Sequence, residues 1–110
     1  MHRHSIIKKT VNYFIMQQDV QAIEWARRTL AVQNVWPIPR LYLAAALALD
    51  GGEVEAREII KHYLSLPAVE IRSIRAMAAW LYMWSPDTPS WSAFVQRLSE
   101  GLRRAGMPEE

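Results

Sequence analysis

The chain has 110 residues, no cysteine, 51% hydrophobic residues and a formal net charge of +2. This length fits one compact domain, and the apolar content excludes a disordered or collagen-like chain. The lack of cysteine excludes a disulfide scaffold, an iron–sulfur cluster and thiol catalysis. The longest stretches without a charged residue, 76–86 among them, are too short to cross a membrane, and the basic N-terminal sequence lacks the apolar core of a signal peptide. We therefore expect a cytoplasmic protein with no membrane partner.

Helical patterns run along the chain, and strand patterns are nearly absent. Apolar residues recur three or four positions apart, and prolines and glycines stand where these segments start and stop. Pro39 and the pair Thr88-Pro89 are typical of first helical turns, whereas Gly51-Gly52 and Gly106 are typical of helix ends. The predicted helices cover residues 5–17, 19–33, 39–50, 53–65, 68–84 and 89–105.

An internal repeat of 34 residues groups these helices into pairs. The run Asp19-Val20-Gln21-Ala22 aligns with Glu53-Val54-Glu55-Ala56 at this offset, and a second step aligns Ala44 with Ala78 and Ala45 with Ala79. Small residues at matching positions suit places where helices approach closely. The alternative is a plain helical bundle in which alanine and leucine match by chance.

A period of 34 with two helices per unit is the length of the tetratricopeptide repeat, and the chain resembles that family over residues 7–100. The run LYLAAALALDGGEVEAR, residues 41–57, is similar to the helix–glycine–helix centre of the repeat. Pro67 and Ser90 depart from the pattern. The resemblance implies an all-α fold, a right-handed superhelical stack of about three antiparallel helix pairs (six helices) with units at about 5–36, 37–67 and 68–106.

A narrower resemblance covers three segments, AIEWARRTLAVQ, WPIPRLYLAAALALDGGEVEAR and the ending EGLRRAGMPEE. These are similar to the C-terminal repeat region of bacterial adenylate/guanylate cyclase-like and winged-helix regulatory proteins. In that family the repeats follow a catalytic or DNA-binding domain, and nothing in this chain matches either one. The resemblance implies the regulatory or interaction part of a bacterial signalling protein, without family catalytic residues to carry over.

The titratable residues do not form a catalytic or metal-binding motif. His2 and His4 lie at the terminus, and His62 follows Glu58 by one helical turn, where an ion pair is expected. Glu53 and Glu55 stand at a helix start, where negative charge stabilises the helix dipole. No serine–histidine–aspartate order, phosphate-binding glycine loop or HExxH motif is present. We expect a protein that is not an enzyme and holds no metal and no cofactor.

Binding of a protein or peptide is the function that this pattern favours. The candidate contacts lie on the first helix of each expected pair: Lys8, Asn12, Leu43, Arg72 and Arg75. Lys8 and Asn12 have the spacing of a clamp for a peptide carboxylate, but no cationic residues at the later equivalent positions complete such a clamp. Three tryptophans near predicted loops are candidate interface aromatics: Trp36, Trp84 and Trp91.

Two other functions remain open at this point. A short stack has apolar ends, so self-association into a homodimer would cover them. Nucleic-acid binding would use a group of basic residues, namely Lys8, Lys9, Arg27, Arg28 and Arg40. A net charge of +2 and the lack of a helix-turn-helix signature give little support to nucleic acid as the partner.

Overall fold

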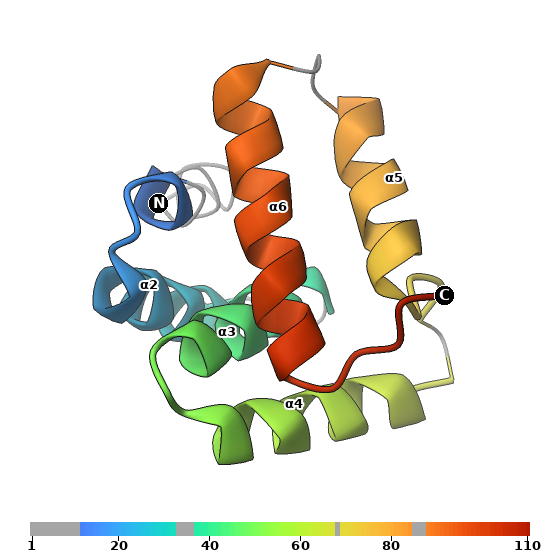
Figure 1. The fold of residues 1–110 in the computed structure, drawn as a ribbon. Helices are drawn as coiled ribbons and strands as arrows, with labels where there is room; N and C mark the ends of the chain where they lie inside the picture. The colour runs from blue at the N-terminus through green and yellow to red at the C-terminus, as the bar shows by residue number, and fades with distance from the viewer. Residues whose placement is uncertain (1–11, 33–36, 68, 85–87) are drawn as a thin grey trace.

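The structure, a computed structural model, describes residues 12–32, 37–67, 69–84 and 88–110. Residues 12–15 are helical. The helices that follow are α2 (Asp19–Val32), α3 (Ile38–Leu49), α4 (Glu53–Ser65), α5 (Ile74–Trp84) and α6 (Pro89–Arg104) (Figure 1). No strand occurs in these ranges, which confirms the all-α prediction. None of the helices in these ranges combines the length and the hydropathy that a membrane span requires.

Helix α3 lies at the centre of the described fold. It packs against α2, α4 and α6, while α5 lies beside α6 (Figure 1). Every residue of α3 from Ile38 to Ala48 is buried except Arg40, which is half-buried. A helix that is apolar on several sides needs neighbours on several sides, and α3 has three.

The third helix pair departs from a regular stack. In a stack of repeats each unit contacts its neighbours through equivalent helices, so α5 would be expected to pack against α3. Here α6 crosses α3 instead, and the helix with which α5 makes extensive contact is α6 (Figure 1). The principal extents of 31 × 29 × 27 Å are nearly equal.

Helix ends follow the local sequence signals. Gly51 has φ 90° after α3, and the amide of Gly52 donates to the carbonyl of Leu47 at 2.7 Å. At the start of α6 the hydroxyl of Thr88 accepts from the amide of Trp91 at 3.2 Å, with Pro89 in the first turn. The proline and glycine positions therefore predicted these ends correctly.

The aromatic core joins three parts of the chain that lie far apart in sequence. The ring of Phe14 packs edge-to-face on Tyr42 of α3 at 6.4 Å and on Phe94 of α6 at 5.9 Å between centroids. Tyr42 and Phe94 are 6.1 Å apart in the same geometry. Such pairs add about 0.5–1.5 kcal/mol each beyond the burial of their area. This cluster fixes α6 across α3.

The 34-residue repeat holds for the first two pairs. Helices α2 and α4 begin at Asp19 and Glu53, and the matched Ala22 and Ala56 are both fully buried.

The second step of the repeat matches only in part, because Leu47 and Leu81 are both buried but the alanines differ. Ala45 is fully buried in α3, whereas Ala79, its partner at the same offset, is exposed, and Ser90 of α6 is also exposed. Gly101 supplies the close approach in this part of the fold, because a Cβ there would lie 2.5 Å from the carbonyl oxygen of Ala45. The physical reason is that α6, rather than α5, lies against the alanine run of α3.

The predicted start of the fifth helix at residue 68 is also wrong. Residues 69–72 are not helical, and α5 begins at Ile74. The side chain of Tyr63 in α4 holds this segment in place, because its hydroxyl donates a hydrogen bond to the carbonyl of Ile71 at 2.6 Å. The hydroxyl of Ser73 then accepts from the amide of Ala76 at 3.1 Å and starts the helix. Differences at other helix ends are small, although residues 5–11 of the first predicted helix lie outside the described ranges, and residues 16–17 form a turn.

Candidate functional site

An open hollow of about 280 Å³ lies between α2, α3 and α4, and we call it the α2–α4 groove. Three aliphatic side chains, one from each helix, line its floor: Leu30, Leu43 and Ile59. Four polar side chains form its rim: Arg40, Glu55, Glu58 and His62. The groove exists because α2 and α4 both pack against α3 and leave their apolar stripes facing the space between them.

Leu43 is the sequence candidate that the structure places in this groove. Its side chain is only 4% exposed, so it offers a small apolar area at the bottom of the hollow. Leu30 and Ile59 are half-buried and offer a larger apolar area. The sequence analysis did not name these two as contacts, although both stand on the apolar stripes of their helices.

The rim carries one ion pair and one unpaired carboxylate. One guanidinium nitrogen of Arg27 lies 3.1 and 2.9 Å from the two carboxylate oxygens of Glu55, which joins α2 to α4. The ion pair expected between Glu58 and His62 is not formed; that prediction was wrong, and the described structure gives Glu58 no partner. A free carboxylate beside an apolar floor favours a ligand with both apolar and cationic groups.

The other predicted contacts do not gather around this groove. Asn12 is exposed near the start of the described chain, and Lys8 lies outside the described residues. The guanidinium of Arg72 donates to the carbonyls of Leu64 and Leu66 at 2.9 and 3.0 Å, so it satisfies the C-terminal end of α4. Arg72 therefore has a structural task where a partner contact was expected.

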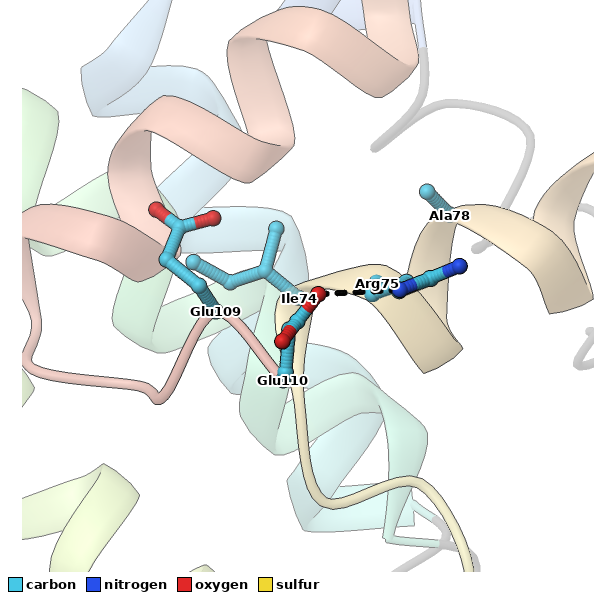
Figure 2. Close-up of a pocket in the computed structure, with 5 residues that line it drawn as sticks. All are labelled: Ile74, Arg75, Ala78, Glu109 and Glu110. Carbon is cyan, nitrogen blue, oxygen red and sulfur yellow. Dashed lines mark hydrogen bonds and ion pairs between the residues drawn. The ribbon is translucent and has the colours of Figure 1, made fainter.

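Arg75 stands beside the C-terminus of the chain. Its guanidinium lies 2.9 Å from a carboxylate oxygen of Glu110, and both side chains are more than 70% exposed. They line a shallow, open hollow of about 490 Å³ together with Ile74, Ala78 and Glu109 (Figure 2). Exposed ion pairs of this kind contribute about 0–1 kcal/mol, so Arg75 remains accessible.

Among the candidate tryptophans, Trp91 is half-buried. Its indole N–H donates to the carbonyl of Leu81 at 3.2 Å, and its ring lies 5.0 Å from that of Phe94. Trp91 thus ties α5 to α6. Trp36 lies outside the described residues, and only the backbone of Trp84, at the end of α5, is described.

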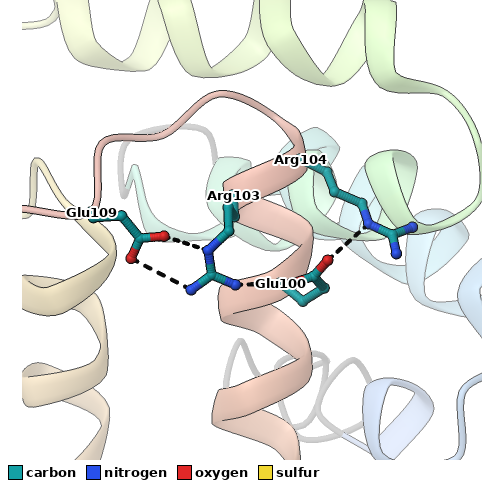
Figure 3. Close-up of polar contacts among 4 residues, drawn as sticks. All are labelled: Glu100, Arg103, Arg104 and Glu109. Atoms are coloured by element: carbon teal, nitrogen blue, oxygen red, sulfur yellow. Dashed lines mark hydrogen bonds and ion pairs between the residues drawn. The ribbon is translucent and has the colours of Figure 1, made fainter.

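A second surface cluster surrounds the end of α6. Glu100 accepts from Arg104 at 3.0 Å and from Arg103 at 2.8 Å, and Arg103 also pairs with Glu109 (Figure 3). The hydrogen bonds from Arg104, and then from Arg103, lower the pKa of the Glu100 carboxyl below its ordinary value. All four side chains are exposed or half-buried, and their ion pairs join the end of α6 to Glu109.

Two of the basic residues suggested for nucleic-acid binding are engaged with carboxylates, whereas Lys8 and Lys9 lie outside the described residues. Arg27 pairs with Glu55, and Arg28 lies 3.4 Å from Glu24 and 5.0 Å from the centroid of the Trp25 ring. Within the described ranges there is no group of three or more residues that could hold a metal ion.

Comparison of the chain with protein-family models, with curated proteins and with solved structures gave no match in any of the three. The assignment of function therefore depends on the geometry of the molecule itself.

Proposed function

We propose that this chain is a non-catalytic protein–protein interaction module that holds a segment of a partner protein in the α2–α4 groove. The observation that carries the proposal is the groove itself, with the aliphatic floor of Leu30, Leu43 and Ile59. The unpaired carboxylate of Glu58 adds a polar contact at its rim. An apolar groove with a charged rim is the usual receptor for the apolar face of a peptide helix.

The size of the groove supports a peptide side chain as the ligand. A volume of about 280 Å³ lies just below the usual range for small-molecule sites, which usually enclose their ligand. This groove is open to solvent, and it suits one or two aliphatic side chains presented by a helix or an extended segment. A lysine or arginine on the same segment would then face Glu58.

We further propose that residues 19–65 form the tetratricopeptide-like part of the molecule. The starts of α2 and α4, 34 residues apart, and the buried pair Ala22 and Ala56 support this view. The module would then act as the interaction part of a bacterial signalling protein in the cytoplasm, as the sequence resemblance implies.

The test is a selection from a peptide library with the purified chain, followed by affinity measurement on two variants. Ile59→Lys places a charge on the groove floor, and Val54→Lys makes the matched change on the same helix where the side chain is 82% exposed. We expect the selected peptides to bind the wild type and Val54→Lys equally and to lose at least about tenfold with Ile59→Lys. Equal binding to all three proteins, or no enriched peptide, would contradict the proposal.

Self-association is a second candidate, supported by apolar side chains at the end of α5. Met83 is 82% exposed and Tyr82 beside it is 38% exposed. Light scattering over a concentration series measures the mass, and Met83→Ser should return any dimer to a monomer. A monomer at every concentration would exclude this second candidate and leave the groove proposal intact.

A further inference from the structure

The N-terminal end of α5 is completed by the C-terminal end of the chain. The amide of Ile74 donates to the carbonyl of Pro108 at 2.8 Å, and the amide of Arg75 donates to the carbonyl of Glu109 at 3.0 Å. The first amides of a helix have no partner within the helix, so an external acceptor must satisfy them. Ser73 supplies one acceptor, to Ala76, and the chain terminus supplies two.

Residues 105–110, which we call the C-terminal strap, are held firmly at the end of α6. Gly106 has φ 88°, and its amide donates to the carbonyl of Arg103 at 3.1 Å. The amide of Met107 donates to the carbonyl of Leu102 at 3.0 Å, which together with the previous bond gives the usual glycine-terminated helix end. The side chain of Met107 is buried, with 4% exposed. This turn directs the strap toward the start of α5 (Figure 1).

Ion pairs add to the backbone contacts of the strap. Arg103 of α6 pairs with Glu109 (Figure 3), and Arg75 of α5 pairs with Glu110 (Figure 2). The two carboxylates lie near the positive end of the α5 dipole, which also favours them. Because these side chains are largely exposed, salt screens the pairs, whereas the carbonyl bonds and the buried Met107 are far less sensitive.

Helix α5 buries Ile74, Met77 and Leu81 in the core, but it has fewer neighbouring helices than α3 in the described structure. It has 11 residues, and isolated helices of fewer than about 12–15 residues are marginal in water. Its extensive helix contact is with α6 alone, through groups such as Leu81 and Trp91. Helix α3, by contrast, packs on three helices. The stability of α5 therefore depends more on the strap than that of any helix packed around α3.

We propose that the C-terminal strap is a conformational device that keeps α5 folded against α6. With the strap in place, the amides of Ile74 and Arg75 are satisfied and α5 is formed. When the strap is released, α5 unfolds locally while α2, α3, α4 and α6 stay folded, and the apolar side chains of Met77 and Leu81 become accessible together with Trp91. This device is independent of the α2–α4 groove, which contains no residue of α5 or of the strap.

Hydrogen exchange measured by mass spectrometry tests this device on the full chain and on a variant that ends at Gly106. We expect the amides of residues 77–84 to exchange at least about tenfold faster in the shortened variant, because two helix-start bonds and a buried side chain are lost. Amides within 38–49 and 53–65 should change less than twofold. Unchanged exchange in α5, or an equal acceleration in all helices, would overturn the proposal.

Two full-length variants complete the test, and they also serve if the shortened chain does not fold. Met107→Ala removes the buried anchor, and we expect a smaller acceleration confined to α5. Glu110→Gln is the control, because it removes an exposed ion pair and leaves both carbonyl bonds; it should leave α5 exchange within about twofold of the wild type. An effect of Met107→Ala that spreads over α3 and α4 would show that Met107 belongs to the global core and would refute the device.

Discussion

The three helices α2, α3 and α4 and the pair α5–α6 are built from similar repeat segments but pack in different ways. In the first region α3 is flanked by α2 and α4, and equivalent alanines, Ala22 and Ala56, are fully buried. In the second region α6 crosses α3 and α5 is attached at the side of α6. The 34-residue spacing therefore corresponds to equivalent packing for α2 and α4, which directly precede and follow α3 in the chain. It does not do so for α5 and α6.

The two regions differ in the small residue that permits close contact between their helices. Around α2 and α4 the alanines of the repeat permit close packing, as their spacing predicts. Between α3 and α6 the closest approach occurs at Gly101, which has no counterpart in the repeat pattern. A single glycine in α6 therefore determines the arrangement of the second region more than the second step of the repeat does.

The largest effect is expected from Gly101→Ala. The new Cβ would lie 2.5 Å from the carbonyl oxygen and 2.8 Å from the Cα of Ala45, and backbone atoms cannot move aside. We expect a loss of at least about 3 kcal/mol in the free energy of unfolding, measured by urea denaturation. Gly51→Ala is the control: nothing lies within 4 Å, and its φ of 90° predicts a cost of about 1–2 kcal/mol. Equal losses in the two variants would mean that α6 does not cross α3 at this point.

A matched pair of alanine substitutions tests the second step of the repeat. Ala45→Val adds two methyl groups at a fully buried site and should cost about 1–3 kcal/mol. Ala79→Val makes the same change at an exposed site and should cost no more than about 0.7 kcal/mol, the helix-propensity cost of valine. Thermal and urea unfolding measure both values. Similar costs would restore the equivalence of α3 and α5 that the repeat predicts.

Tyr63 connects the first region to the segment before α5. Its hydroxyl donates to the carbonyl of Ile71, so Tyr63→Phe should cost about 1 kcal/mol at neutral pH. Burial raises the pKa of Tyr63 above its ordinary 10.0, although the charge of Arg72 partly lowers it. The unfolded chain ionises first, so this contribution is present below pH 10 and is lost as pH rises through the folded pKa. Urea unfolding at pH 7 to 11 should give a shallower alkaline decline for Tyr63→Phe; an identical slope would exclude this role.

The smallest effect is expected from Glu100, which forms ion pairs with Arg103 and Arg104 at the end of α6. The pKa of Glu100 is lowered by hydrogen bonds from Arg104 and Arg103, so its contribution is present above the ordinary value of 4.5. That contribution is lost as pH falls through the lowered folded pKa. Glu100→Gln should slightly flatten the acid side of the stability profile, and added salt should reduce the difference because the group is exposed. A carboxyl titration by NMR that gives an ordinary pKa would contradict this assignment.

Much of the secondary structure could be predicted from local signals, whereas the site could be predicted only in part. The bounds of α4 follow from the glycines before Glu53 and from the apolar spacing of the helix. Leu43 was found as a candidate because of its position on a first helix. Ile59 and Leu30 were not, because an apolar residue on a helix stripe looks the same in sequence whether it faces a core or a groove.

The start of α5 shows a further limit of sequence patterns. Residues 69–72 have nothing in their composition that forbids a helix, yet they are not helical, and Tyr63 and Arg72 make hydrogen bonds across the α4–α5 junction. Serine is a common residue at helix starts, and Ser73 could have predicted the start of α5. The apolar residues before it, however, continue a helical pattern that predicts an earlier start. Contacts between distant side chains decided this boundary.

The helical class and most helix ends follow from local patterns, because periodicity, prolines and glycines act within a few residues. Contacts across the fold are needed for α6 to cross α3 at Gly101, for residues 108–109 to complete the start of α5, and for Leu30, Leu43 and Ile59 to share one groove. Each of these features joins residues that are distant in the chain. Their formation depends on shape, close approach and unsatisfied backbone groups, which no local pattern records.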